Sequence, residues 1–378
     1  MRIEPRLAYA HTRFSISHMK HILTIIGARP QFIKASVVSK AIADTAGLRE
    51  TLVHTGQHFD ANMSEIFFDQ LGIPRPHHQL HIHGGGHGEM TGRMLIEIEK
   101  VLLAEKPDCV MVYGDTNSTL AGALAAAKLH IPVAHVEAGL RSFNMAMPEE
   151  VNRILTDRVS SLLFCPTAAA VANLQQEGFP FVTASAQAQR IAQVGDVMQD
   201  SALLFASRAA APAGFACADG FILSTIHRAE NTDTPERLRS ILSALSEAAK
   251  HTPVVLPMHP RTRKIAASLG LDTSHLTLID PVGYLEMLWL LQHCGLVLTD
   301  SGGVQKEAFF MGKACVTMRD QTEWVELVEE GANELVGADA EKILAAIPRH
   351  LGRPVHDAKQ LYGGGQAAGR VAALLQTL

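Results

Sequence analysis

The sequence predicts an α/β protein in which two parallel sheets, each covered by helices, form two halves of similar size. Short, continuously apolar segments alternate with segments whose apolar residues recur at helical spacing, which is typical of parallel sheets buried on both faces. The chain has 378 residues, which is long for one domain. The alternation starts again after an Ala-, Pro- and Gly-rich stretch at 208–219, so we expect two domains with a cleft between them.

The individual elements follow from these patterns. In the first half we expect strands at 21–26, 50–54, 109–113, 131–136 and 162–166, a short strand or turn at 193–196, and helices from about 32 and at 63–71, 90–105, 118–129 and 149–161. In the second half we expect strands at 221–225, 254–258, 277–279, 296–299 and 315–318, helices at 235–251, 261–269, 284–293 and 305–311, and a mostly helical tail over 340–378. We interpret 1–20 as an extension, and 74–88 as a loop because it holds Gly, Pro and five His.

Composition narrows the class of protein. The formal net charge is −5, which does not favour nucleic acid as a partner, and 47% hydrophobic residues permit a sizeable core. No run approaches the ~20 apolar residues that span a bilayer, and residues 1–20 lack the apolar core of a signal peptide. The five Cys show no CxxC spacing, so a disulfide framework or zinc ribbon is not expected and a reducing cytoplasm fits.

Two motifs that follow strands are suited to an anion. Arg29 and Lys34 lie at a strand–loop–helix junction, where free N–H groups and a forked guanidinium favour phosphate, although Arg29 could equally be a solvated surface residue. The second motif follows the strand 296–299 and reads Asp300, Ser301, Gly302 and Gly303. It fits a phosphate turn or an ordinary N-cap. Glu307, one turn further on, fits either a ribose ligand or a helix-face acid.

Carboxylates also gather at the strand ends. Asp115 and Glu137 each follow a separate predicted parallel strand, which places both at the ligand-binding edge of the sheet, and Glu149 and Glu150 begin the next helix. Each could be a cap or a solvated acid. Because two of these carboxylates lie at one edge of the sheet with Arg141 nearby, we favour the interpretation that they act as a pair, one as base and one as acid.

Histidines occupy two other places. His227 and His259 follow strands of the second half, so His227 could face phosphate across the cleft. The histidines at 77–87 match no metal-ligand spacing, and we expect no metal site there.

Several motifs in register resemble the non-hydrolysing UDP-N-acetylglucosamine 2-epimerases. The resemblance runs from about Ile22 to the C-terminus and rests on these segments: GARP at 27–30, TGQH at 55–58, GDT at 114–116, HVEAGLR at 135–141, PEExNR at 148–153, HRxEN at 227–231 and TDSGGxQxE at 299–307. It implies two Rossmann-like doubly wound domains facing a cleft, the glycosyltransferase-B-like arrangement. The expected parts are an extension (1–20), an N-terminal domain with the acid/base residues (21–205), a UDP-binding domain (206–360) and a C-terminal helix that crosses back (361–378).

The resemblance also implies the chemistry. The C2 proton is removed while UDP is eliminated, a 2-acetamidoglucal stays bound, and UDP adds back with the proton delivered to the opposite face. By motif, the catalytic residues are Asp115, Glu137, Glu149 and His227. The substrate-binding residues are Arg29, Lys34, His58, Arg141, Val282, Met287, Ser301, Gly302, Gly303 and Glu307. No cofactor or metal is implied, and the resemblance suggests a cytoplasmic homodimer, an isomerase, without nucleic-acid or membrane partners.

Departures from the family pattern suggest which sugar is bound. Trp324 stands where the family usually has an arginine, and the first motif continues with Gln31 and Phe32 where Glu and Ala are usual. These variants resemble the subgroup that acts on UDP-2,3-diacetamido-2,3-dideoxyglucuronate for O-antigen synthesis. Its C6 carboxylate needs a further cation, for which Arg93, Arg141 and Arg153 are candidates. The alternatives are a UDP-GlcNAc 2-epimerase, a hydrolysing 2-epimerase, a glycosyltransferase of the same fold or a non-catalytic nucleotide-sugar binding protein.

Overall fold

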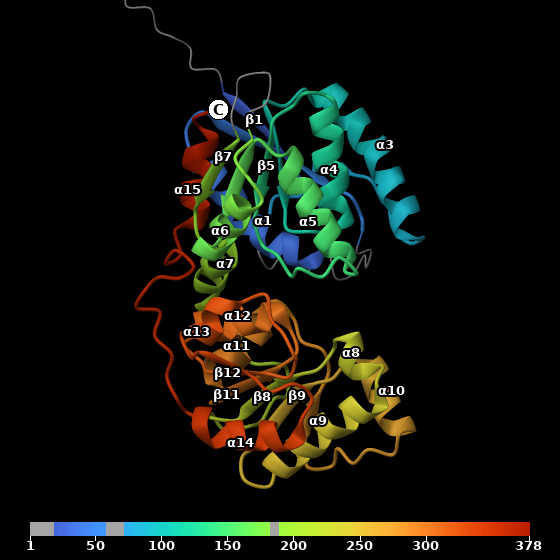
Figure 1. The fold of residues 1–378 in the computed structure, drawn as a ribbon, viewed down its shortest axis with the longest axis vertical. Helices are drawn as coiled ribbons and strands as arrows, with labels where there is room; N and C mark the ends of the chain where they lie inside the picture. Colours follow the sequence, from blue (N-terminus) through green and yellow to red (C-terminus); the bar gives the residue numbers. More distant parts are fainter. Residues whose placement is uncertain (1–18, 58–71, 182–188) are drawn as a thin grey trace, which may run out of the picture.

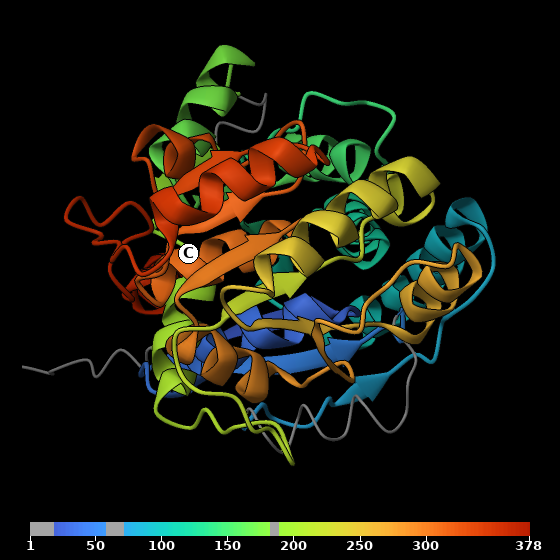
Figure 2. The ribbon, with the colours of Figure 1, turned by 90° about the horizontal axis from the view of Figure 1, so that it is seen from below.

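The structure is a computed structural model, and it describes residues 19–57, 72–181 and 189–378. It consists of two lobes, one above the other in Figure 1. Each lobe is a parallel sheet with helices on both faces. Seen from below, the yellow and orange C-terminal lobe lies in front of the blue and teal N-terminal lobe (Figure 2). The expected helix at 63–71 and His58 lie outside the described residues.

The N-terminal sheet has, among the described residues, seven parallel strands in the order β3-β2-β1-β4-β5-β6-β7. They are β1 (Lys20–Ile26), β2 (Leu48–His54), β3 (His78–Gln79), β4 (Cys109–Tyr113), β5 (Val133–Val136), β6 (Leu162–Cys165) and β7 (Arg190–Gln193). Its helices are α1 (Arg29–Ala43), α3 (His87–Glu105), α4 (Asn117–Lys128), α5 (Pro148–Val159), α6 (Ala168–Gln176) and α7 (Val197–Ala206).

The C-terminal sheet has the order β10-β9-β8-β11-β12-β13, again all parallel among the described residues. Its strands are β8 (Ile222–Thr225), β9 (Val254–Pro257), β10 (Thr277–Ile279), β11 (Leu296–Thr299), β12 (Cys315–Thr317) and β13 (Asn333–Leu335). The helices are α8 (Ala229–Thr232), α9 (Pro235–Ala248), α10 (Pro260–Ser268), α11 (Tyr284–His293), α12 (Gly302–Phe310), α13 (Val325–Glu329), α14 (Ala340–His350) and α15 (Ala367–Leu375).

The strand orders confirm the predicted fold class. In each sheet successive strands are first added on one side and then on the other, and this strand order reverses between β1 and β4 in the N-terminal lobe and between β8 and β11 in the C-terminal lobe. This is the doubly wound arrangement, in which ligands bind beyond the carboxyl ends of the strands at the reversal. The topology therefore directs the search for a site to the turns that follow these four strands.

Several local predictions were wrong. The segment 74–88 is not only a loop: His78 and Gln79 pair with β2 as an edge strand, and α3 already begins at His87. Helix α1 begins at Arg29 rather than near Phe32 because Pro30 fits the first helical turn. Where a short strand or turn was expected at 193–196, the strand β7 instead spans Arg190–Gln193 and ends at the start of that segment. The tail is helical only in α14 and α15.

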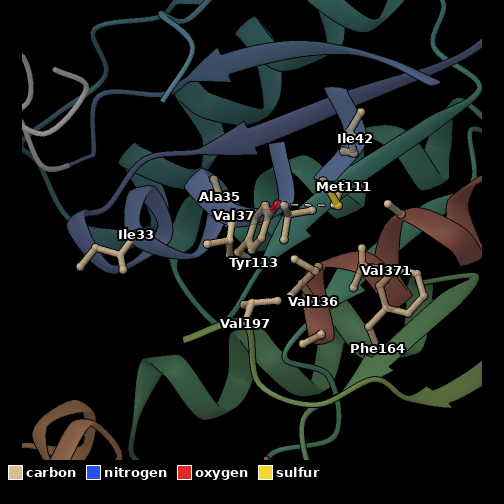
Figure 3. Packing of buried hydrophobic residues seen from close by; sticks show 14 of the residues in the cluster. Ile33, Ala35, Val37, Ile42, Met111, Tyr113, Val136, Phe164, Val197 and Val371 are labelled. Atoms are coloured by element: carbon tan, nitrogen blue, oxygen red, sulfur yellow. Dashed lines mark hydrogen bonds between the residues drawn. The ribbon is translucent and has the colours of Figure 1, made fainter. Parts of the chain in front are cut away.

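The C-terminal helix α15 packs on the N-terminal lobe, and Figure 1 shows it beside β7. The segment 351–366 connects α14 of the C-terminal lobe to this helix. Val371 of α15 lies in one core cluster with Phe164 and Val136 of the N-terminal sheet (Figure 3). Buried Asp200 of α7 accepts the N–H groups of Ala367 and Ala368 at 3.1 and 2.8 Å, so it satisfies two donors at the start of α15. The exact domain boundaries, at 205/206 and 360/361, remain predictions.

Within the described ranges, no helix combines the length and apolar character needed to cross a membrane.

Replacing Asp200 with Ala should lower the free energy of unfolding by about 1–2 kcal/mol, because two N–H groups of α15 lose their acceptor. Denaturant unfolding followed by circular dichroism measures this change. Asp200→Asn, which keeps one carbonyl acceptor, should lose less. Equal stability of Asp200→Ala and the unchanged protein would contradict the capping role.

Candidate active site

The candidate site lies between the lobes, where turns that follow strands of both sheets meet. A cavity of about 370 Å³ is lined from the N-terminal lobe by Asp115, Glu149 and Arg153, and from the C-terminal lobe by Arg228 and Arg319. Asp115 and Glu149 also line a second cavity of about 190 Å³, which extends to Lys34. The two carboxylates therefore form a shared wall of both cavities.

The turn after β1 brings two cations to this region. Gly27 ends the strand against Thr55 and Ser118, where a Cβ atom would lie 2.1 and 2.2 Å from their hydroxyl oxygens, so only glycine permits this packing. The next residues start α1, and Arg29 Nη2 donates to the carbonyl oxygen of Val282 in the C-terminal lobe at 3.4 Å. Lys34, one turn further along, is buried and lines the smaller cavity.

Glu137 lies between ammonium groups from opposite lobes. Its carboxylate accepts a hydrogen bond from Lys34, and Lys306 Nζ of α12 lies 3.3 Å from Oε1. Its φ of +75° lies in the left-handed region that non-glycine residues rarely adopt. Burial alone would raise the pKa of Glu137, but Lys34 and Lys306 outweigh it and lower the pKa to about 2. The carboxylate is thus ionised at neutral pH.

Asp115 is held by a network from α5. Its carboxylate pairs with Arg153, and its carbonyl oxygen accepts from Asn152 Nδ2 at 2.9 Å. Arg153 also donates to Glu150 Oε2 at 2.8 Å, and the buried Glu150 carboxylate accepts the N–H groups of Ser142 and the following residue. Glu150 is therefore a structural partner of the loop, whereas Glu149, its neighbour, is exposed toward the cavities.

Across the cleft, Asp300 organises the turn after β8. Its carboxylate accepts the backbone N–H groups of His227 and Arg228 at 3.1 Å, and lies 3.1 Å from His227 Nδ1. Burial would raise the pKa of Asp300, but hydrogen bonds from His227 and Asn231 lower it. The His227 ring remains about half exposed, and the next residue, Arg228, lines the larger cavity.

The predicted phosphate turn is the N-terminus of α12. Ser301 is the N-cap, and its Oγ accepts from the N–H of Val304 at 3.4 Å. Gly302 has no room for a side chain, since a Cβ atom would lie 2.2 Å from Glu323 Oε1, whereas Gly303 is exposed. Glu307 is buried further along α12, and burial raises its pKa to about 7 despite Lys306 and Arg29 nearby. A carboxyl group near its pKa can accept from or donate to a ribose hydroxyl.

The remaining predicted residues differ in their burial and in their partners. Val282 and Met287 are partly buried in one apolar cluster of the C-terminal lobe. Arg141 lines the larger cavity, but its guanidinium is bound by Asp157 at 2.8 Å and Glu177 at 2.6 Å, so it mainly fixes the turn after β5. Arg93 is exposed on α3 beside Glu89.

The histidines of the segment at 77–87 have separate partners. His77 Nδ1 accepts from the N–H of Leu52, and His78 pairs with Glu105. Among the described residues, no group of three or more His, Cys, Asp or Glu side chains is arranged to hold a metal ion.

Sequence reasoning missed Lys306 and its partner Asp196. Lys306 Nζ lies 2.5 Å from Asp196 Oδ2 and 3.9 Å from the centroid of the Trp324 ring. The local pattern offered little to find them, because a lysine inside a short helix is typical of a solvated face. Its position directly before Glu307, in a helix that opens with the phosphate turn, was the one available indication.

Comparisons with known proteins agree with this geometry. A family model described as UDP-N-acetylglucosamine 2-epimerase matches residues 40–376. The UDP-2,3-diacetamido-2,3-dideoxy-D-glucuronate 2-epimerase of Pseudomonas aeruginosa is 68% identical over 358 residues, covering 94% of this chain and 99% of that protein. The UDP-GlcNAc 2-epimerase of Methanocaldococcus jannaschii, solved with UDP-GlcNAc and UDP, matches with a TM-score of 0.83 at 43% identity, covering 95% of this chain and all of that one.

A third match is the UDP-GlcNAc 2-epimerase of Neisseria meningitidis bound to UDP-GlcNAc, with a TM-score of 0.83 at 30% identity, covering 95% of this chain and 100% of that one. The family model spans most of the sequence, and these relatives align over nearly their full length. The resemblance inferred from the motifs is therefore confirmed, and the chain belongs to the UDP-N-acetylglucosamine 2-epimerase family.

Proposed function

We propose that the chain interconverts UDP-2,3-diacetamido-2,3-dideoxy-D-glucuronate and its mannuronate epimer, without hydrolysis, in the cleft between the lobes. The choice of sugar is supported by the 68% identical relative that carries this activity in its name. The main support for proton transfer by carboxylates is that Asp115 and Glu149 line both cavities and that Glu137 is ionised nearby.

The proposed reaction proceeds by elimination and re-addition. A carboxylate takes the C2 proton while the bond between C1 and the diphosphate oxygen breaks, which leaves a 2-acetamidoglucal and UDP. UDP then attacks C1 again, and a carboxyl group on the other face protonates C2. Asp115, Glu137 and Glu149 supply the carboxylates. Because C2–H is weakly acidic, stabilising the departing diphosphate must share the work.

The binding groups for UDP come from both lobes. The start of α12, with the exposed Gly303, offers N–H groups to the diphosphate, the Ser301 hydroxyl can donate as well, and Arg29 and His227 add further donors. Glu307 is suited to the ribose hydroxyls. Arg228 lines the larger cavity with its guanidinium 3.9 Å from Glu323, so it is the lining cation best placed to accept a sugar carboxylate. Arg141 and Arg153 line the same cavity but are already paired with two carboxylates each, and Arg93 lies apart on α3.

We also propose that the chain acts as a homodimer in the cytoplasm, in O-antigen synthesis. Ile96 and Leu103 lie seven residues apart on α3 and are 56% and 57% exposed, which gives its outer face an apolar stripe suited to a second copy. The five free cysteines fit a reducing compartment. The alternatives of another class, a glycosyltransferase or a non-catalytic binding protein, do not need several carboxylates to move a C2 proton, and family membership favours the epimerase.

Changing Asp115 to Asn or Glu137 to Gln should lower turnover at least about a hundredfold, because the proton-transfer group is lost. Proton NMR in D₂O follows the exchange of C2–H, and calorimetry with UDP checks that the nucleotide still binds. Glu341→Gln, the same change on an exposed helix, is the matched control. Full exchange in either cleft variant would remove that residue from the mechanism.

Turnover should discriminate between sugars. In parallel reactions in D₂O, deuterium should appear at C2 with UDP-2,3-diacetamido-2,3-dideoxy-D-glucuronate, while UDP-GlcNAc should react at least tenfold more slowly because it lacks the C6 carboxylate and the C3 acetamido group and therefore the contacts that these make in the transition state. Faster turnover of UDP-GlcNAc would refute the proposed substrate. Release of free sugar and UDP would instead indicate a hydrolysing enzyme.

The dimer can be tested separately. Ile96→Glu combined with Leu103→Glu should convert a dimer into a folded monomer, because both side chains are exposed in the single chain and contact the partner in the proposed pair. Light scattering after size exclusion measures the mass. A monomeric unchanged protein at micromolar concentration, or a dimer unaffected by both charges, would contradict this interface.

A further inference from the structure

The buried ammonium of Lys306 joins the two lobes at the site. Lys306 belongs to α12 of the C-terminal lobe, and its side chain is only 3% exposed. Its two carboxylate partners belong to the N-terminal lobe: Glu137 follows β5, and Asp196 is the N-cap of α7. A buried cation with two buried anions resists separation, since removal of one partner leaves an uncompensated charge.

Trp324 completes the surroundings of this ammonium. The ring is buried, and Lys306 Nζ lies 3.9 Å from its centroid, a distance at which the ring face attracts a cation. Neighbouring Thr322, Glu323 and Val325 line the larger cavity. The tryptophan that stands in place of the family's arginine is thus turned toward Lys306.

We propose that Lys306 is a positioning residue of the epimerisation: it holds the Glu137 carboxylate in place from the opposite lobe, with the face of Trp324 fixing the ammonium. This inference rests on the proposed function. Lys306 follows Gly303 of the predicted phosphate turn by three residues in the same helix, so the buried cluster ties the position of that turn to the position of the Glu137 carboxylate.

Several charged and titratable groups around Lys306 also influence the pKa of Glu137. Beyond Glu137 and Asp196, the groups that surround Lys306 and Glu137 are Lys34, Arg29, Arg153, Glu307, Glu326, Tyr284 and Tyr362. Lys34 contacts Glu137 directly and remains when Lys306 is removed. Two ammonium groups lower the pKa of Glu137, so loss of one must raise it.

The test is the pH dependence of kcat/KM. Because Glu137 acts as a carboxylate, activity is lost as the pH falls through its pKa, and a raised pKa moves this acid limb to higher pH. Lys306→Met should move the limb upward by about one unit or more and lower kcat at least tenfold. Lys306→Arg keeps the charge and should return the limb toward its original pH. Lys342→Met, the same change at an exposed lysine, is the matched control.

A second variant guards against misfolding of Lys306→Met. Combining Asp196→Asn with Lys306→Met removes one of the two anions that would otherwise be left without a cation. In the unchanged protein Asp196 Oδ1 accepts the N–H of Met198 at 2.8 Å, and the side-chain oxygen of the asparagine can keep this hydrogen bond. Circular dichroism and UDP binding identify folded variants, and the folded one should show the same upward shift. Trp324→Leu, which removes the ring face, should shift the limb more than Trp324→Phe.

The inference would be overturned by a variant without Lys306 that folds and binds UDP but keeps the acid limb of its pH profile unchanged. It would also be overturned if kcat fell by the same factor at all pH values, because this indicates a purely structural role. These results are distinguishable from failure of the proposed function. If Glu137→Gln abolishes C2–H exchange while Lys306 variants leave the limb in place, only the inference fails. If Glu137→Gln retains exchange, the role given to Glu137 fails first.

Discussion

The structure depends on a charge cluster buried where the two lobes meet. Glu137 and Asp196 from one lobe share the ammonium of Lys306 from the other, and Lys34 adds a second cation to Glu137. Such a cluster is stable only while all members are present, because burial penalises each unpaired charge. It fixes the distance between the phosphate turn and the carboxylates, and it keeps Glu137 ionised inside a low-dielectric region.

The doubly wound topology explains why these groups meet at all. Each parallel sheet gathers the turns after its strands at one edge, and the lobes present these edges to the same cavity. The N-terminal edge supplies carboxylates and Arg153, and the C-terminal edge supplies the helix N-terminus, His227 and Arg228. In the proposed mechanism, acid/base chemistry and leaving-group binding are therefore divided between the two lobes, which α15 and the buried cluster connect.

Much of the fold could be predicted because its information is local. The buried strand β4 coincides with the predicted 109–113 segment, since a short, continuous apolar run bounded by polar turns is typical of a strand covered on both faces. The edge strand β3 could not be found this way, because it is only two polar residues long, one half-buried and one exposed, and therefore leaves no apolar pattern. Helix α7 was overlooked although it carries Asp200 and is capped by Asp196.

In the site, too, residues marked by a local sequence pattern could be predicted, and residues defined by distant partners could not. Asp115, Glu137 and Ser301 follow predicted strands, so residue type and position together pointed to them. Lys306 could not be assigned from its own segment, because its role comes from partners 110 and 169 positions away in the sequence. Likewise, Arg141 looked like a free cation in the sequence, whereas Asp157 and Glu177 bind its guanidinium in the folded chain.

The most direct test of the account is a crystal structure with UDP and the sugar bound. The account predicts the diphosphate at the start of α12, beside Gly303 and the Ser301 hydroxyl, with C2 of the sugar within about 3.5 Å of a carboxylate oxygen of Asp115, Glu137 or Glu149. A sugar bound with C2 away from all three carboxylates, while the diphosphate occupies the turn, would contradict the proposed catalysis between the lobes.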